Sequence, residues 1–446
     1  MAADTHTQGA AERRDRAVRA AVEQGLLERE PVVCLLDVAG IRASAAALTE
    51  AFAAAVAPGT PVLHTFAVKA APLVPVLRLL ADAGLGCEAA SPGELALARA
   101  AGVPADRTVL DSPAKTTAEL RGALARGIAV NADNRQELER LDALVAAAPA
   151  RSPVGLRINP QTGTGSIGAL STATATSKFG FALRDPGARE RLVRACAQRP
   201  WLTRLHVHSG SQGVPLELIA EGVRELHGLA EEINAAVGER RIDTLDIGGG
   251  LPVNFASDEH APTYGEYVAA LRAAVPALFD GPYGLVTEFG RSLLAKHGLV
   301  LARVEYTKTT GGRRIALTHA GVQVATRTVY APAAWPLRIL AYDAKGVPRD
   351  GAPVPQDIAG PACFAGDLLA TARELPELSP GDVIAVPDTG AYAFTAHYGY
   401  NSLPRPAVHG FTPGPADTVR FALARPAQTL TEIVTEAGGD HRDALL

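Results

Sequence analysis

Side chains that can do chemistry recur where strand-like runs of this sequence end. Lys69 ends HTFAVK, His208 follows RLHV, and Glu288 and Arg291 lie in GLVTEFGR. Three glycines, Gly248–Gly250, end the run TLDIGGG. An amine, an imidazole and a carboxylate serve nucleophilic and acid–base catalysis, and glycines let backbone N–H groups approach a ligand closely. If the strands are parallel, one edge of the sheet carries all of these groups.

Lys69 raises the first question, because it follows a run of apolar and β-prone residues. A buried ammonium is costly unless it is paired or neutralised. Lys69 therefore either points from a strand end into water or uses its amine chemically. Each other group also has a structural explanation: a histidine after a strand, a tight glycine turn, or a salt bridge between Glu288 and Arg291. Their joint occurrence favours a functional site.

The elements that must position these groups alternate along the chain. From about residue 45 to 295, runs such as RTVLD, IAVNAD and VGLRIN alternate with helical patterns such as NRQELERLDALVAAA. This rhythm predicts a parallel sheet with helical crossovers. Eight such units in roughly 250 residues predict a TIM (β/α)8 barrel at 45–295, in which polar residues at strand C-terminal ends face the active site. A doubly wound sheet is the alternative.

The pattern changes after residue 295. LVLARVEYTKTTGGRRIALTHAG alternates with period two around a Gly-Gly turn, which is typical of an antiparallel hairpin. The sequence therefore predicts a mostly antiparallel β domain at 296–446. The strand-like run EPVVCLLDVAG precedes the barrel, and we expect the segment 1–44 to join this β domain.

Composition restricts the class of protein. The chain has 446 residues, is 47% hydrophobic and carries a net charge of −4, which predicts no nucleic-acid partner and no membrane partner. The four cysteines, Cys34, Cys87, Cys196 and Cys363, form no CxxC pair and fit no zinc spacing, so no metal site is predicted. We interpret them as reduced thiols of a cytoplasmic protein. The polar N-terminal segment lacks the apolar core of a signal peptide.

The groups at the strand ends together meet the needs of pyridoxal 5'-phosphate (PLP). An amine must form a Schiff base with the aldehyde, and a carboxylate must hold a proton on the pyridine nitrogen. A glycine-rich turn lets backbone N–H groups approach the phosphate, and an arginine can assist there. An imidazole can stack on the ring. The sequence thus predicts a PLP site around Lys69.

The order of six motifs supports this hypothesis. FAVKA, HVHSGSQ, DIGGG, EFGR, GPACFAGD and DTGAYAF…YNS resemble the motifs of the fold-type III PLP-dependent decarboxylases, which include the diaminopimelate and ornithine decarboxylases. The resemblance extends over about residues 30–410 and is closest to a divergent bacterial subgroup. It implies a barrel with a β domain, and a PLP-dependent carboxy-lyase that acts on an amino acid or an amino-acid-derived intermediate.

The resemblance also implies roles for individual residues. Lys69 would form the Schiff base, His208 would stack on the ring, and Glu288 would pair with the pyridine nitrogen. Cys363 would enter the site of a partner subunit and reprotonate the carbanion left by CO₂, which implies a homodimer with shared active sites. Residues that would hold the phosphate are Ser211, Gly249, Gly250, Arg291 and Tyr392.

Residues expected at the substrate depart from the family pattern. Phe364 stands where relatives carry a carboxylate that contacts the distal end of the substrate. Arg327 falls near an arginine that grips a distal carboxylate, or it is an ordinary surface or interface arginine. Asp367 contacts substrate or is a structural loop carboxylate, and Glu88 lies near the cofactor or in a local salt bridge. Phe364 cannot pair with a distal ammonium, so we predict a small-molecule amino-acid substrate without one, and diaminopimelate stays open as the alternative.

Two other functions stay open from the sequence. An amino-acid racemase, or another PLP carbanion chemistry, would share the barrel and the lysine, but a racemase needs two bases on opposite faces of the cofactor. HVHSGSQ and GPACFAGD favour decarboxylation instead. A non-catalytic PLP-binding protein is the minor alternative, and the presence of Lys69, Glu288 and Cys363 argues against it.

Overall fold

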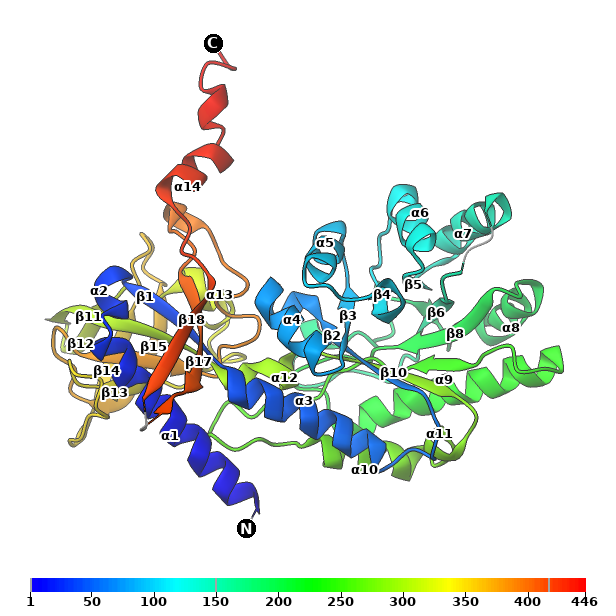
Figure 1. The fold of residues 1–446 in the computed structure, drawn as a ribbon, viewed down its shortest axis with the longest axis horizontal. Coiled ribbons are helices and arrows are strands. Elements are labelled where there is room, and N and C mark those ends of the chain that lie inside the picture. Colours follow the sequence, from blue (N-terminus) through cyan, green and yellow to red (C-terminus); the bar gives the residue numbers. More distant parts are fainter. Residues whose placement is uncertain (1, 149–150, 416–417) are drawn as a thin grey trace. The chain divides into compact units, whose positions relative to one another are not determined.

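The chain folds into two compact units. The computed structural model describes residues 2–148, 151–415 and 418–446, with side chains from residue 9 onward (Figure 1). The barrel unit comprises residues 42–253 and 261–293. The β unit comprises residues 1–41, 254–260 and 294–446. Each unit is described by itself below.

The barrel unit is built on eight parallel strands. They are β2 (Val62–Ala67), β3 (Gly86–Ala89), β4 (Thr108–Leu110), β5 (Ala129–Ala132), β6 (Val154–Asn159), β8 (Leu202–Val207), β9 (Thr244–Asp246) and β10 (Gly284–Phe289). Their order is β5-β4-β3-β2-β10-β9-β8-β6, and β5 also pairs with β6, which closes the sheet. The short strand β7 (Phe181–Ala182) pairs with β6 alone. The predicted TIM barrel is confirmed, and the doubly wound alternative is wrong because the sheet has no open edge.

Helices connect the barrel strands, and their ends follow capping rules. They are α3 (Val38–Ala53), α4 (Val74–Asp82), α5 (Pro92–Ala100), α6 (Thr117–Arg126), α7 (Arg135–Ala147), α8 (Ala188–Gln198), α9 (Leu216–Val237), α10 (Tyr264–Ala274), α11 (Ala277–Asp280) and α12 (Arg291–Leu294). Thr116 and Glu119 form a capping box at the start of α6, and Gly127 ends that helix in the left-handed conformation. Such defined ends set where each following strand begins.

Aromatic packing fixes the end of β10, which carries Glu288. Phe289 is fully buried, and its ring meets the rings of Tyr264 and Tyr267 edge-on, each at a centroid distance of 5.2 Å. Phe52 of α3 also packs against Tyr267. Because edge-to-face pairs of buried rings are both favourable and directional, they hold the residues beside Phe289 in a defined place.

The β unit contains a mixed, mostly antiparallel sheet, as predicted. Its strands are β1 (Val32–Asp37), β11 (Gly298–Thr310), β12 (Arg313–Thr318), β13 (Leu340–Tyr342), β14 (Pro353–Ala359), β15 (Leu368–Pro376), β16 (Val383–Pro387), β17 (Ala407–Pro413) and β18 (Val419–Arg425). β1 lies between β11, antiparallel to it, and β17, parallel to it. The N-terminal strand is therefore central in this sheet.

Helices α1 (Ala2–Glu23), α2 (Leu26–Arg29), α13 (Val322–Tyr330) and α14 (Leu430–Glu436) complete the β unit. Ala17, Val18 and Ala21 of α1 are fully buried and pack in one core with Val33 and Leu299. Burial of this apolar face is what attaches α1 to the sheet.

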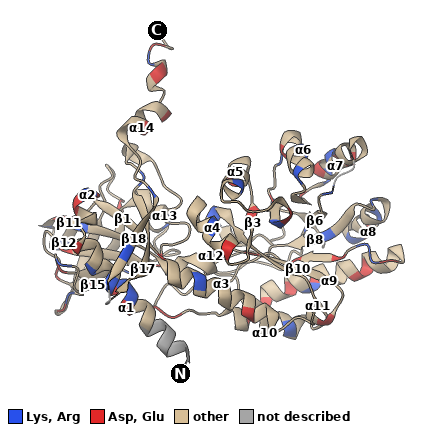
Figure 2. Cartoon of the chain, viewed as in Figure 1, with Lys and Arg blue, Asp and Glu red and all other residues tan. Residues whose placement is uncertain are grey.

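Charge is distributed without one dominant sign. Acidic and basic residues are interspersed along α7 and α10, whereas α9 is mainly acidic (Figure 2), in keeping with the net charge of −4. Among the described helices, none combines the length and the apolar character that crossing a bilayer requires.

Candidate active site

Polar side chains from most of the barrel strands converge within the barrel unit. Because the strands are parallel, their C-terminal ends meet at one end of the barrel. The residues found there are Lys69, Glu88, Asp111, Arg157, His206, His208, Gly248–Gly250 and Glu288. Among them, Lys69, Glu88, His208, the glycines and Glu288 are residues that the sequence motifs already indicated.

Lys69 lies beyond the end of its strand. β2 ends at Ala67, and the short 3-10 helix η1 (Val68–Ala70) carries Lys69 out of the apolar run. Its side chain is 45% exposed, and its ammonium forms an ion pair with Glu88. The strand therefore does not bury the amine, which lies past the strand end and partly in solvent. Glu88 is buried, which raises its pKa, and Lys69 opposes that rise.

Glu288 is a buried acid with one oxygen uncommitted. It lies near the end of β10, and its Oε1 has no hydrogen-bond partner among the described residues. Its Oε2 is 3.3 Å from Nε2 of His206. Burial, together with the nearby carboxyl groups of Glu88 and Asp111, raises the pKa of Glu288 well above its ordinary value.

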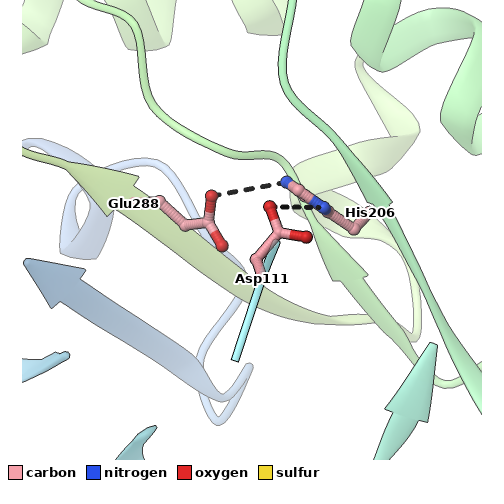
Figure 3. Close-up of side chains that lie close together, drawn as sticks. All are labelled: Asp111, His206 and Glu288. Carbon is pink, nitrogen blue, oxygen red and sulfur yellow. Dashed lines mark ion pairs between the residues drawn. The ribbon is translucent and has the colours of Figure 1, made fainter. Parts of the chain in front are cut away.

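Behind Glu288 lie three groups whose roles sequence reasoning missed. Figure 3 shows the carboxyl groups of Glu288 and Asp111 both facing the ring of His206, with Nδ1 of His206 at 3.5 Å from Oδ2 of Asp111. Nη1 of Arg157 donates to the same Oδ2 at 3.0 Å. Although burial opposes it, Arg157 holds the pKa of Asp111 well below its usual range. A signal was present in the sequence, because Asp111, Arg157 and His206 are polar residues in or just after strand-like apolar runs, as Lys69 is.

His208 and the glycine turn hold each other in place. The Gly249 N–H donates to Nδ1 of His208 at 3.2 Å, so the neutral ring carries its proton on Nε2. Burial lowers the pKa of His208 well below its ordinary value. Gly248 and Gly250 have φ of 65° and 101°, in the left-handed region. A Cβ at Gly249 would overlap the carbonyl oxygen of Glu288, so the turn must be glycine.

Ser211 and Arg291, also predicted site residues, lie in the same unit. The Ser211 N–H donates to the carbonyl of Leu170 at 3.1 Å, and the adjacent Gln212 is hydrogen-bonded to Val253 in both directions. Arg291 begins α12, directly after β10, and is buried. The loop after β8 is thus held at Ser211 and at the residue that follows it.

Cys363 and Asp367 lie on one loop of the β unit. Cys363 is exposed, and its N–H donates to Oδ1 of Asn401 at 2.7 Å. Asp367 is buried, and its two oxygens accept from the N–H groups of Val322 and Ala362, each at 2.7 Å. One oxygen therefore holds the loop that carries Cys363 and the other holds the start of α13, which favours the structural interpretation of Asp367 that the sequence left open.

Phe364 belongs to a group of four rings that we call the aromatic cluster: Tyr330, Phe364, Tyr398 and Tyr400. Phe364 stacks on Tyr330 at 5.8 Å and meets Tyr400 edge-on at 5.6 Å. Tyr398 stacks on Tyr400 at 6.1 Å and meets Tyr330 edge-on at 6.0 Å. The three tyrosines are exposed, which is unusual for large aromatic side chains gathered in one place.

Arg327 and Tyr392 also contact each other in the β unit. The Arg327 guanidinium lies 4.8 Å from the ring centroid of Tyr392 and 5.1 Å from that of Trp335. Its Nη1 is buried and has no hydrogen-bond partner among the described residues. Burial lowers the pKa of Arg327. A guanidinium between two rings with an unsatisfied buried donor is suited to bind an anion.

The residues of the barrel unit fit PLP. Lys69 offers an amine, Glu288 offers a buried oxygen without a partner among the described residues, and the glycine turn leaves a cradle that a Cβ would fill. These are the groups that a pyridine aldehyde with a phosphate requires. The barrel and this set of side chains define a PLP-dependent enzyme.

Comparison with known proteins gives the family. The model of the pyridoxal-dependent decarboxylases, pyridoxal binding domain, matches residues 39–295. The diaminopimelate decarboxylase of Pseudomonas aeruginosa is 36% identical over 371 residues, which are 82% of this chain and 85% of that protein. That of Actinosynnema pretiosum subsp. auranticum is 35% identical over 389 residues, 86% of this chain and 84% of that protein. The chain belongs to the family of pyridoxal-dependent decarboxylases.

Solved structures agree with this assignment. Diaminopimelate decarboxylase from Helicobacter pylori, complexed with L-lysine, superposes with a TM-score of 0.79 at 25% identity over 94% of this chain and 99% of that one. The enzyme from M. jannaschii, also with L-lysine, gives 0.81 at 25% identity over 93% and 94%. The chain is accordingly a carboxy-lyase of amino-acid metabolism that uses PLP.

Proposed function

We propose that this chain decarboxylates an amino acid, or an amino-acid-derived intermediate, that has no distal ammonium, and that it does so as a homodimer in the cytoplasm. The observation that carries the substrate class is the aromatic cluster around Phe364, because aromatic rings stand where an ammonium would need a carboxylate. The homodimer follows from the proposed use of Cys363 in a partner's site. Cys363 can donate a proton only as a reduced thiol, and the cytoplasm is a reducing compartment that keeps thiols in this state.

Lys69 and Glu88 would prepare the amine. When bound, PLP supplies an electron-accepting ring conjugated to the reacting carbon of the amino acid. An ammonium must lose a proton before it can attack an aldehyde. Glu88 contacts Lys69, and its burial raises its pKa, so Glu88 is placed to accept that proton. The half-exposed position of Lys69 leaves the amine accessible to cofactor and substrate.

The remaining barrel groups would orient the cofactor. Oε1 of Glu288 would hold a proton on the ring nitrogen, and His208, fixed by Gly249, would lie against the ring face. The proposed phosphate set comprises Ser211, Gly249, Gly250 and Arg291 of the barrel unit, and Tyr392 of the β unit is the remaining member that we propose. A rigid arrangement of these groups reduces the entropy lost when the reacting bond is aligned.

Cys363 would donate the final proton in the partner's site. It is the exposed cysteine of the four, and its loop is fixed by Asn401 and Asp367. A thiol at a two-fold interface can serve the neighbouring active site, so each of two identical sites would take Lys69 from one subunit and Cys363 from the other.

Hybrid dimers test this arrangement. Lys69→Ala and Cys363→Ala are each expected to lose most decarboxylation when pure. Subunits mixed under exchange should regain about a quarter of wild-type CO₂ release, because half of the dimers are hybrids with one intact site of two. A double variant mixed with Cys363→Ala has no intact site and is the control. If hybrid dimers form but regain no activity, Cys363 does not act across the interface.

Side chains of the β unit support the proposed class of substrate. The L-lysine of the two solved relatives carries a distal ammonium. In this chain Phe364 packs between Tyr330 and Tyr400, and such rings prefer an apolar or aromatic group. Arg327, with its unsatisfied Nη1, is suited to a distal carboxylate. We therefore propose a substrate with an apolar or acidic distal part.

A CO₂-release screen tests the substrate class. The panel comprises L- and D-amino acids, meso-diaminopimelate, and N-acylated or carrier-linked amino acids. Phe364→Glu should shift preference toward substrates with a distal ammonium by about tenfold, because a charged pair partly shielded from water contributes on the order of 1–2 kcal/mol. Phe364→Tyr is the matched control. Release from diaminopimelate by the wild-type enzyme would mean that Phe364 does not exclude an ammonium, and α-proton exchange without CO₂ would indicate a racemase.

A further inference from the structure

His206 has no part in the roles proposed so far, although it lies at the centre of the buried charges. Its side chain is fully buried and two acids face it, with Nε2 at 3.3 Å from Glu288 and Nδ1 at 3.5 Å from Asp111 (Figure 3). The other histidine of HVHSGSQ, His208, contacts the glycine turn instead. His206 on β8 and His208 just after it thus face different partners.

The positions of the charges determine where the protons lie. Asp111 is kept ionised by Arg157, so the ring nitrogen that faces Asp111, Nδ1, carries a hydrogen. Burial lowers the pKa of His206, which favours the neutral ring, and a neutral ring then presents a lone pair at Nε2. Glu288, whose pKa is raised, meets this lone pair with a protonated carboxyl group. Neither ring nitrogen of His206 has a hydrogen-bond partner among the described residues, but Nε2 lies 3.3 Å from Oε2 of Glu288, close enough for the two groups to share one proton after a small movement.

We propose that Arg157, Asp111 and His206 form a proton-sharing chain that lets Glu288 become a carboxylate when its Oε1 faces the protonated ring nitrogen of the cofactor. In this step the O–H bond at Oε2 of Glu288 breaks, and an N–H bond forms at Nε2 of His206. The proton stays inside the pair, and the resulting imidazolium lies between two carboxylates. The inference rests on the role proposed for Glu288, and it makes His206 and Asp111 positioning residues.

The surroundings explain why a neighbouring base is needed. Water cannot readily take the proton, because the His206 side chain has no exposed surface and Glu288 very little. Negative neighbours also disfavour an ionised Glu288 unless a cation forms beside it. Charged or titratable groups that face the pair from the surrounding elements are Lys69, Glu88, Asp111, Arg157, Arg204, His208 and Asp246. At 3.3 Å the contact is long for a hydrogen bond, but such contacts often shorten when a catalytic site is filled.

His206→Asn is the direct test, with PLP affinity measured by absorbance or fluorescence titration across pH. In the wild type, the internal proton transfer makes ionisation of Glu288 independent of solvent pH. In the variant, Glu288 keeps its proton at neutral pH and loses it to solvent only above its raised pKa. We expect PLP to bind about tenfold more weakly than to wild type near pH 7, a factor that corresponds to one pKa unit. The difference should close as the pH rises above the raised pKa of Glu288.

His64→Asn is the matched control. His64 is a buried histidine on β2, beside β10, and its Nδ1 lies 2.9 Å from the hydroxyl of Thr287. The His64→Asn substitution also removes a buried imidazole ring from the barrel, but it leaves the groups that face Glu288 unchanged. The ratio of its PLP affinity to that of the wild type should not vary with pH. Taking ratios to wild type also removes the pH dependence of Lys69 and of PLP itself.

Three outcomes separate the possibilities. Equal affinity of His206→Asn and wild type at every pH overturns the proton-sharing chain, and so does a loss that is constant with pH, because a packing defect does not titrate. If wild-type protein itself binds no PLP, the proposed function fails rather than this inference. Asp111→Asn provides a second variant should His206→Asn not fold, and the same pH-dependent loss is expected from it.

Infrared difference spectra offer an independent readout. Adding PLP to the wild-type apoenzyme should remove the carbonyl stretch of one protonated carboxyl group, which Glu288→Gln identifies as that of Glu288. In His206→Asn at neutral pH that signal should persist after PLP is added. A wild-type spectrum in which Glu288 keeps its proton after PLP binds would contradict the proposal.

Discussion

Lys69→Ala abolishes the visible absorption of lysine-bound PLP and lowers CO₂ release by about 10³-fold or more, the range seen when a covalent nucleophile is removed. The reason is positional. Lys69 is the lysine that η1 places beside the buried Glu88, and no other described group offers an amine there. Absorption spectra and CO₂ release of PLP-loaded protein measure the effect.

The other lysines of the barrel unit provide the contrast for this prediction. Lys115 is fully buried and pairs with Glu137 at 2.8 Å, so its amine is already committed. Lys178 is exposed and lies over the ring of Phe179. Lys178→Ala should therefore retain both the absorption and the activity. A Lys69→Ala protein that still showed covalently bound PLP would refute the role of Lys69.

Glu288→Gln is expected to keep the cofactor attached to Lys69 but to lower CO₂ release by about 10²–10³-fold, a loss comparable to removal of one preorganised electrostatic group. Glutamine has the shape of glutamate but cannot carry the negative charge that holds a proton on a ring nitrogen. The electron-accepting power of the ring should fall accordingly. Steady-state CO₂ release, measured beside the absorption spectrum, separates lost chemistry from lost binding.

A buried acid elsewhere in the barrel serves as the control for Glu288→Gln. Glu137 is buried, pairs with Lys115 and accepts from the Asp133 N–H at 2.9 Å. Glu137→Gln tests the general cost of neutralising a buried carboxyl group, and we expect it to change stability more than turnover. Equal losses of turnover in the two variants would show that Glu288 has no special role.

Much of the fold followed from the sequence because its signals are local. Strand-like runs bounded by helical patterns predicted the barrel, and period-two alternation predicted the β unit. The course of the chain at Lys69 was harder to predict, because the apolar run continues to Val68 while the strand already ends at Ala67. The short 3-10 helix η1 places the amine beyond the end of β2, whereas a longer strand would have placed it in the barrel wall.

The parts of the site that the sequence could not give depend on contacts between distant segments. Asp111 follows β4 and His206 lies on β8, and closure of the barrel brings these two distant segments into contact. An aspartate or a histidine in the sequence does not by itself indicate which residue it will contact. The aromatic cluster likewise joins Tyr330, Phe364 and the pair Tyr398 and Tyr400 from three separate segments. The departure of Phe364 from the family pattern could be recognised in the sequence, but the tyrosine rings that surround it could not.

The most direct test of the account is to locate the cofactor on the chain. PLP-loaded protein is reduced with borohydride, digested, and analysed by mass spectrometry, with all six lysines covered. The account predicts a single pyridoxyl group per subunit, on the peptide that contains Lys69. A label on Lys115 or any other lysine, or no label at all on protein that has been saturated with PLP, would contradict it.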